Sequence, residues 1–208
     1  MIKKIILKLN RVLLVFRRKI VWKITRVKHL MYIYTFFSSI NSTDYVLVKI
    51  DPNFPFISFG SDFDIFLSDI SNFEQSIQKH YKNKKYYKLG TIVKTKSNIQ
   101  IDLTFKDQFI YKFDLYDKNY ESKIYNRNFI WDVIKSKKER TYYFIKKYSI
   151  NIPDLTYGSL VRLFEYYENP HKSHHLNEIN KLSKNKIRSL SKDIDLYSDL
   201  KLEEIINI

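Results

Sequence analysis

The chain contains no cysteine and only three glycines, at positions 60, 90 and 158. Without cysteine there can be no disulfide and no metal site built on thiolates, and the composition is compatible with a reducing cytosol. Three scattered glycines exclude the glycine-rich loops with which dinucleotide-binding and Walker-type proteins hold phosphate groups. Any bound nucleotide must therefore be held through a metal ion and side chains.

Acidic residues are absent before Asp44, whereas ten lysines and arginines precede it. The net charge of +15 is concentrated there, because the other 27 basic residues (37 less ten) face 22 acidic ones. Such an uneven distribution disfavours nucleic acid as the partner of the whole chain. Apolar residues such as Ile2, Ile5 and Leu9 recur at three- and four-residue steps among the bases, which predicts a basic amphipathic helix.

Long hydrophobic runs are also missing from this basic segment. Between its first and last bases, Lys3 and Lys28, the longest uncharged run is Val12 to Phe16, far shorter than the roughly 20 residues that span a bilayer. We therefore expect neither export nor a transmembrane anchor. Two alternatives remain for the helix: it lies on an anionic membrane, or it packs on the domain with snorkelling Lys and Arg stems. The expected location is cytoplasmic, with peripheral contact at the inner face of the membrane in the first case.

Two carboxylates stand two positions apart in the apolar stretch from Ile57 to Leu67. Asp62 and Asp64 alternate with Phe63 and Ile65, so on a strand both acids leave the same face. Paired carboxylates repel each other unless a cation lies between them, which favours a hard metal ion such as Mg2+ or Mn2+.

A second alternating stretch, Asn98 to Phe105, carries a third acid, Asp102, between Ile101 and Leu103. If the two strands are sheet neighbours, Asp102 stands beside Asp62 and Asp64. Three carboxylates on one face can hold two metal ions about 3.5 to 4 Å apart, the arrangement that clamps the attacking and leaving oxygens in phosphoryl transfer.

At this point the sequence resembles the nucleotidyltransferase superfamily with the DNA polymerase β type of fold. The resemblance covers about residues 44–105 and consists of Asp62-Phe63-Asp64, a helical pattern over 71–82, and Ile101-Asp102-Leu103. It implies a metal-dependent enzyme that moves a nucleotidyl group from a nucleoside triphosphate to a hydroxyl or phosphate acceptor, such as a small molecule or glycan precursor. Asp62 and Asp64 would ligate the metal ions, and Asp102 would ligate the metal at the acceptor and help activate its hydroxyl.

The nucleotide contacts depart from the usual pattern of this superfamily. Most members carry a Gly-Ser dipeptide about a dozen residues before the Asp pair, whereas Lys49-Ile50 stands there in this chain. The chain's single Gly-Ser, Gly60-Ser61, directly precedes Asp62. The pattern resembles a divergent branch often found near surface-polysaccharide genes, which implies cofactor contacts from Lys49, as a point charge for phosphate, and from Gly60 and Ser61.

The periodicities together predict an α+β protein of three parts. A basic helical segment covers 1–40, a small mixed β-sheet of nucleotidyltransferase-like topology covers 41–118, and a helical subdomain covers 119–208. Strands are expected over 44–50, 57–67, 91–96, 98–105 and 109–115. The last three are joined as hairpins, the second of them through a Lys106-Asp107-Gln108 turn. Helices are expected over 128–138, over 155–169 with entry through Pro153-Asp154, and over 172–189.

Other interpretations of these motifs stay open. The Asp-x-Asp pair could be the solvated face of an ordinary strand. A non-catalytic nucleotide-binding or scaffold protein of the same fold, or a metal-dependent glycosyl or sugar-phosphate transferase, would also fit. Arg162 and Lys172 are candidate phosphate contacts, although an intrahelical pair of Arg162 with Glu165 is favoured. His171, His174 and His175 are interpreted as a polar helix start, not as a zinc site.

Overall fold

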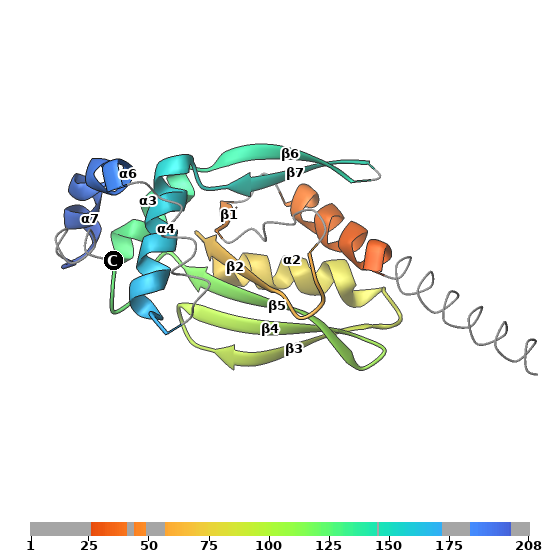
Figure 1. Cartoon of the computed structure of the whole chain (residues 1–208). Coiled ribbons are helices and arrows are strands. Elements are labelled where there is room, and N and C mark those ends of the chain that lie inside the picture. Colours follow the sequence, from red (N-terminus) through yellow and green to blue (C-terminus); the bar gives the residue numbers. More distant parts are fainter. Residues whose placement is uncertain (1–25, 41–43, 49–56, 145, 172–183, 201–208) are drawn as a thin grey trace, which may run out of the picture.

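The computed structural model describes residues 26–40, 44–48, 57–144, 146–171 and 184–200. The first half contains a helix over residues 26–39, then β1 (Tyr45–Leu47), β2 (Asp62–Leu67), α2 (Ile70–Lys82), β3 (Tyr87–Lys94), β4 (Asn98–Phe105) and β5 (Gln108–Asp117). The second half contains α3 (Arg127–Lys135), β6 (Lys138–Phe144), β7 (Lys146–Ile152), α4 (Leu155–Glu168), α6 (Lys184–Ser189) and α7 (Ser191–Tyr197). The protein is therefore α+β, as the sequence predicted (Figure 1).

Five strands form one mixed sheet in the order β1-β2-β5-β4-β3. β2 and β5 run parallel, and every other neighbouring pair runs antiparallel. The predicted hairpins of β3 with β4 and of β4 with β5 are confirmed. β5, the last of these strands in the sequence, lies between β2 and β4, and this insertion decides which side chains meet on the sheet.

Local sequence explains where the central elements begin and turn. α2 starts after Asp69, whose side chain accepts a hydrogen bond from the Asn72 amide at 2.9 Å, as N-caps do. Lys106 and Asp107 both have positive φ, 51° and 62°, which is the geometry of a two-residue type I′ hairpin. The predicted helix over 71–82 and the predicted Lys106-Asp107-Gln108 turn are both confirmed.

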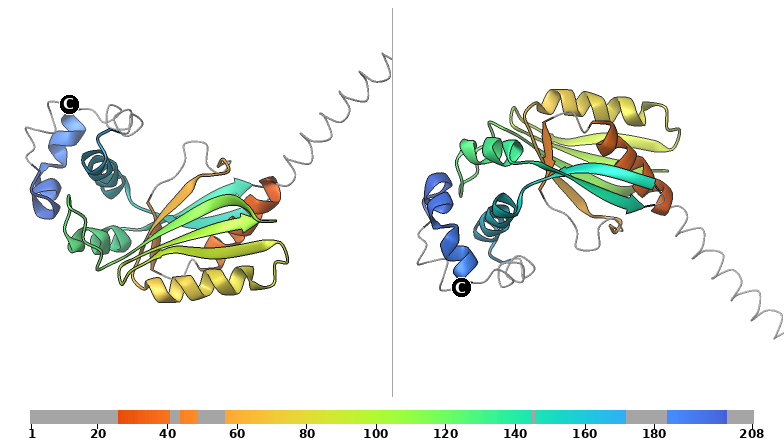
Figure 2. Two further views of the ribbon diagram at one scale, coloured as in Figure 1. Left: turned by 90° about the horizontal axis from the view of Figure 1, so that it is seen from below. Right: turned by 90° about the horizontal axis from the view of Figure 1, so that it is seen from above.

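One face of the sheet is covered by the helix over residues 26–39 and by α2 (Figure 2). Phe36 and Phe37 of the first helix are almost fully buried and pack with Phe73 of α2 and Phe63 of β2. The described end of the predicted segment 1–40, the helix over residues 26–39, therefore packs on the domain. Residues 1–25, which carry most of its basic side chains, lie outside the described residues, so their membrane contact stays a prediction.

A second core forms at the end of the sheet where α3, α4 and α7 gather (Figure 2). Phe129 and Phe164 are fully buried there, with ring centroids 4.9 Å apart. Val46 and Phe66 from β1 and β2 reach into this core. The helical elements predicted around 128–138 and 155–169 are confirmed as α3 and α4, and α4 begins at the predicted Asp154 cap.

The predicted helical subdomain over 119–208 also contains two strands that the sequence did not predict, within residues 138–152. β6 and β7 form an antiparallel hairpin there, from Lys138 opposite Ile152 to Phe144 opposite Lys146. The hairpin exists because Tyr148 and Ile150 of β7 are buried in the first core, where Tyr148 packs on Tyr34. Across the described ranges, no helix is both long and apolar enough to cross a membrane.

Candidate functional site

A polar row crosses the open face of the sheet from β2 through β5 to β4. Asp62 is opposite Lys112 in the β2–β5 register, and Lys112 is opposite Asp102 in the β5–β4 register. Asp62 and Asp102 therefore lie on either side of Lys112, two strand spacings or roughly 9 to 10 Å apart. The expectation that the strands of the Asp pair and of Asp102 are neighbours is wrong, because β5 lies between them.

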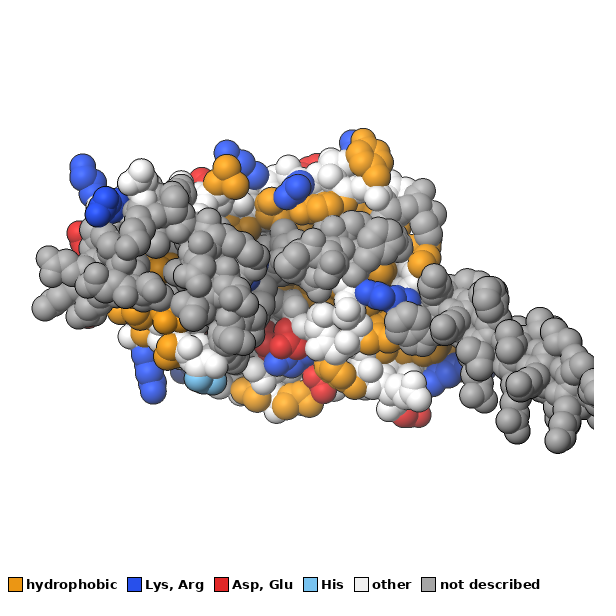
Figure 3. Space-filling view, viewed as in Figure 1, with side chains coloured by type: hydrophobic (Ala, Val, Ile, Leu, Met, Phe, Trp, Pro, Cys, Tyr) orange, Lys and Arg blue, Asp and Glu red, His pale blue; other side chains and the backbone are white. Residues whose placement is uncertain are grey.

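In the next row of the sheet, the acid beside Asp64 is Asp114 and not the expected Asp102. Asp64 is opposite Asp114 of β5, and Asp114 is opposite Gln100 of β4. Because residues 62, 64, 112 and 114 alternate with buried apolar residues, their side chains share one face. Figure 3 shows acidic and basic side chains gathered near the middle of this face. The structure thus brings Asp62 and Asp64 together with Asp114, not with Asp102.

Asp114 is the most buried acid of this group, with a relative exposure of 5%. Its Oδ1 atom is buried and has no hydrogen-bond partner among the residues that the structure describes. Burial raises the pKa of Asp114, Lys112 lowers it, and the charges of Asp62 and Asp102 raise it again, so that the pKa lies above its usual value. A buried carboxylate oxygen without a partner is costly, and such an atom indicates that a cation or donor belongs there.

Lys112 is the internal cation of the site. Its Nζ lies 3.1 Å from Asp114 Oδ2 and 3.4 Å from Asp62 Oδ2. Burial alone would lower the pKa of Lys112, but its hydrogen bonds and charge contacts with Asp114 and Asp62 outweigh burial and raise the pKa. Lys112 is therefore charged at neutral pH and neutralises part of the acidic group.

The carboxylates fit a hard divalent ion in donor chemistry, since Mg2+ prefers oxygen ligands. Asp64 and Asp114 are register partners on adjacent strands, and Asp114 offers an oxygen without a partner. As they stand, no three acidic or histidine side chains of the described ranges are close enough to hold a metal ion together. A metal ion would have to displace Lys112 before Asp62, Asp64 and Asp114 could meet on it.

Gly60 and Ser61 form the turn that leads into β2. Gly60 has a φ of 85°, a left-handed conformation that glycine adopts without strain. Its amide donates to the Ile110 carbonyl at 2.8 Å, and the Lys112 amide donates to the Ser61 carbonyl at 3.3 Å. These bonds fix the start of β2 against β5, so both residues have a structural role. Lys49 lies outside the described residues.

A small cavity of about 50 Å3 connects the acidic face to the helical end of the molecule. Asp64 lines it from β2, Tyr116 from β5, and Glu165 and Glu168 from α4. Burial, and then the charges of Asp64 and Asp114, raise the pKa of Tyr116 well above its usual value. Tyr116 thus remains a neutral hydroxyl beside the acids at physiological pH.

The remaining candidate contacts lie on α4 and just after it. Arg162 Nη1 lies 3.5 Å from Glu165 Oε2 on the same helix, which is the intrahelical pair that the sequence favoured. His171 is exposed, whereas Lys172, His174 and His175 lie outside the described residues.

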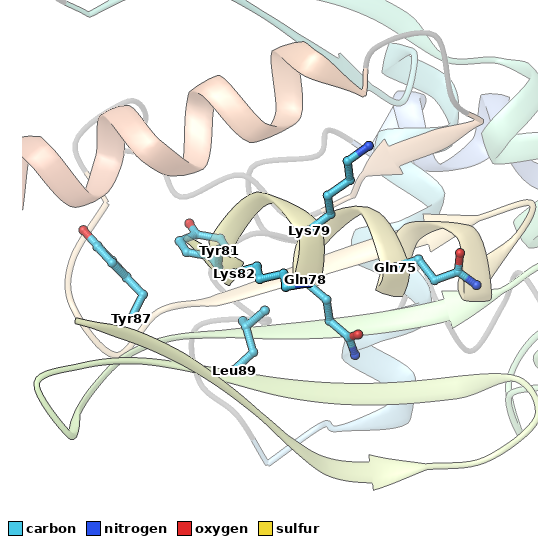
Figure 4. A pocket seen from close by; sticks show the side chains of 7 residues that line it. All are labelled: Gln75, Gln78, Lys79, Tyr81, Lys82, Tyr87 and Leu89. Carbon is cyan, nitrogen blue, oxygen red and sulfur yellow. The ribbon is translucent and has the colours of Figure 1, made fainter. Parts of the chain in front are cut away.

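An open groove of about 710 Å3 lies between α2 and β3, on the face of the sheet opposite the carboxylates (Figure 4). Gln75, Gln78 and Lys79 line it from α2, and Tyr87 and Leu89 line it from β3. None of its lining residues is acidic, so this groove offers no carboxylate ligand for a metal ion.

The sequence reasoning missed Asp114 and Lys112, although a signal for Asp114 was present. Phe113-Asp114-Leu115 has the same apolar-acid-apolar pattern as Ile101-Asp102-Leu103, and both lie on alternating strands. The choice between the two acids depends on which strand neighbours β2, which no local pattern specifies.

Comparison with protein-family models and with curated proteins gives no match to this chain. Only the geometry of the site therefore points to a function.

Proposed function

We propose that this protein transfers a nucleotidyl group from a nucleoside triphosphate to a hydroxyl or phosphate acceptor, with Mg2+ or Mn2+ held by Asp62, Asp64 and Asp114. One observation carries the proposal: a strand with two acids on one face runs parallel to a strand whose acid, Asp114, is buried beside them, with one oxygen that finds no hydrogen-bond partner in the described part of the chain. The order of elements, with α2 between the strand of the acid pair and the later acidic strand, supports a nucleotidyltransferase-like topology.

Each side chain has a distinct role in this proposal. Asp62 and Asp64 bind the metal, which supplies charge neutralisation for the triphosphate and the departing pyrophosphate when bound. Asp114 would complete the metal ligands through one carboxylate oxygen and accept the proton of the acceptor hydroxyl at the other. Lys112, displaced from the carboxylates, is positioned to contact a phosphate oxygen as a point charge. Glu165 and Glu168, across the small cavity from Asp64, form the wall that the acceptor meets.

The test compares two acids that the sequence could not tell apart. The full chain is incubated with each nucleoside triphosphate, Mg2+ or Mn2+ and a metabolite extract containing sugar phosphates, and pyrophosphate release is measured. Asp114→Asn and Asp64→Asn should each lower the rate by about a hundredfold or more, the usual cost of losing a group that acts in the transition state. Asp102→Asn, a matched change two strands from Asp62, should stay within about threefold of the unchanged protein.

Equal losses for Asp102→Asn and Asp114→Asn would reject the assignment of Asp114. Nucleotide-dependent activity that persists in both Asp64→Asn and Asp114→Asn would reject metal-dependent transfer at this face. Including nucleotide sugars in the same assay covers the alternative of sugar transfer, which would appear as release of a nucleoside diphosphate instead of pyrophosphate.

A second function is favoured by Lys112 itself. Its ammonium already stands between Asp62 and Asp114, where a catalytic metal would be needed. A nucleotide-binding or scaffold protein of the same fold could keep this internal ion pair permanently. Nucleotide binding without turnover, and without any dependence on Mg2+, would support this second function over the first.

A further inference from the structure

Three connections and the start of the first helix lie together at one end of the molecule. The helix over residues 26–39 begins there, α2 passes into β3, β4 turns into β5, and β6 meets β7, as the views in Figure 1 and Figure 2 agree. The carboxylates of the site proposed above belong to β2 and β5 on the open face of the sheet, and α3, α4 and α7 occupy the opposite end. The end surface is therefore separate from the site already described.

Exposed aromatic side chains concentrate at this end. The large hydrophobic side chains exposed in the described ranges include three aromatic ones, Tyr86 (50% exposed), Phe109 (45%) and Tyr143 (78%). Tyr86 precedes β3, Phe109 follows the β4–β5 turn, and Tyr143 is near the end of β6, so each belongs to a different connection of this end. An exposed aromatic ring thus lies in or next to each of the three connections at this end.

Lysines lie over one of these rings, that of Tyr86, and over Tyr32 nearby in the first helix. Lys106 Nζ lies 5.3 Å and Lys85 Nζ 5.6 Å from the centroid of Tyr86, and Lys28 Nζ lies 5.8 Å from that of Tyr32 on the first helix. Asp107, the acid of the β4–β5 turn, is paired with Lys88. The local positive charge is therefore not cancelled by the nearest carboxylate.

The sequence explains this charge. Between Glu74 and Asp102 the chain has no acidic residue, and Lys82, Lys84 and Lys85 lie at or next to the α2–β3 connection. Lys94 lies at the far end of β3, where it is paired with Glu74, and does not belong to this surface. The described part of the first helix begins at this end with Arg26 and Lys28. Basic residues from two distant parts of the sequence therefore lie together here.

We propose that this end, the turn-end surface made of Lys28, Lys85, Tyr86, Lys106, Phe109 and Tyr143, docks the folded domain on an anionic lipid membrane. Aromatic rings with polar edges favour the boundary between headgroups and hydrocarbon, and lysines near the surface are attracted to anionic lipids. Charge complementarity excludes a second copy of the same surface as the occupant, since like charges would oppose each other.

Nucleic acid is the main competing occupant, because basic grooves with aromatic rings also bind single strands. The contacts favour the membrane. Lys85 and Lys106 both lie over the Tyr86 ring, so a base would have to displace a lysine to stack on it. The three rings also come from three projecting connections and not from the walls of one groove.

The test uses the full chain and vesicles of phosphatidylglycerol and phosphatidylcholine in equal parts, with pure phosphatidylcholine vesicles as reference. A triple variant, Lys28→Gln, Lys85→Gln and Lys106→Gln, should bind the anionic vesicles at least about tenfold more weakly in sedimentation, because three surface charges are lost. At high salt the charge contribution is screened, and the vesicle binding that remains comes from the aromatic rings. Replacing Tyr86, Phe109 and Tyr143 by Ser should weaken this remaining binding.

The control matched to the lysine triple variant replaces three exposed lysines at the opposite end, Lys118, Lys123 and Lys135, by Gln. Two of these also lie over an aromatic ring, that of Trp131, at 5.5 and 5.0 Å. This control should bind vesicles within about twofold of the unchanged protein, and circular dichroism verifies that every variant is folded.

Three outcomes would overturn the inference. Equal weakening by both lysine triples would mean that net charge alone acts. Unchanged vesicle binding by the turn-end variants would restrict any membrane contact to residues 1–25. Binding to a single-stranded oligonucleotide that is lost in the turn-end triple, with no vesicle binding by the unchanged chain, would assign the surface to nucleic acid.

Discussion

Lys112 decides the electrostatics of the acidic face. It is the central residue of a row in which Asp62 and Asp102 flank it, and it contacts Asp114 in the next row. Its side chain is 28% exposed, so it can leave the carboxylates without a change of backbone. A divalent ion and this ammonium compete for the same oxygens, which couples metal binding to the position of one side chain.

The residue-scale prediction follows from that competition. Lys112→Met removes the competing charge and should raise the affinity for Mn2+, without nucleotide, by roughly tenfold or more, because a unit charge a few ångströms away contributes a few kcal/mol near a protein surface. Titration calorimetry measures this affinity. Lys88→Met is the control, because Lys88 is an exposed lysine of β3 that is paired with Asp107 of the β4–β5 turn. This change should leave the affinity for Mn2+ unchanged. Weaker Mn2+ binding by Lys112→Met would show that the ammonium does not occupy the metal position.

At the scale of elements, two histidines join the first helix to the sheet and to α2. His29 is 2% exposed and its Nδ1 is hydrogen-bonded to the hydroxyl of Tyr87 at the start of β3. His80 of α2 contacts the Tyr32 carbonyl through Nε2 at 3.1 Å. Burial, with a smaller contribution from a neighbouring lysine, lowers the pKa of both histidines from 6.5 to about 4.

The lowered pKa of His29 predicts a pH dependence with a definite sign. The unfolded chain binds a proton at His29 near pH 6.5, whereas the folded protein binds it only near pH 4. The stabilisation is therefore complete above pH 6.5 and is lost as the pH falls towards 4, by up to about 3 kcal/mol. Urea unfolding between pH 7 and 4 measures it. His29→Gln, which cannot titrate, should lose less stability over this range; parallel curves for the two proteins would contradict the assignment.

At the scale of the whole molecule, β1 and β2 belong to both hydrophobic cores. Tyr45, Ile65 and Leu67 pack with the first helix and α2, whereas Val46 and Phe66 pack with α3 and α4. Each strand therefore presents alternate residues to different helices. Because the same two strands support both cores, loss of one core should destabilise the other.

This shared support predicts a single unfolding transition. Phe129→Ala, at the fully buried centre of the second core, should lower the free energy of unfolding by about 3 to 5 kcal/mol. Circular dichroism, which reports mainly on the whole fold, and fluorescence of Trp131 on α3 should still change together in urea. Tyr143→Ala, at a residue 78% exposed, should stay within about 0.5 kcal/mol. Separate transitions for the two probes would show that the cores unfold independently.

Much of this architecture could be predicted from sequence because the relevant signals are local. Alternation of apolar and polar residues placed Asp62 and Asp64 on one face of a strand. The Asp154 cap and the Lys106-Asp107 turn marked where elements begin and reverse. The hairpin of residues 138–152 escaped prediction because its buried residues are specified by Tyr34, more than a hundred positions earlier.

The amino-acid sequence by itself determined which residues share a face, since a strand turns its side chains with a period of two whatever lies next to it. Only the tertiary structure decided which strand stands beside β2, and hence that Asp114 and Lys112, not Asp102, adjoin the acid pair. It also decided that Lys82, Lys84 and Lys85 lie at the same end of the molecule as Lys28, near the start of the described first helix. The physical reason is that strand order is chosen by burial of apolar faces contributed from the whole chain, which no short pattern records.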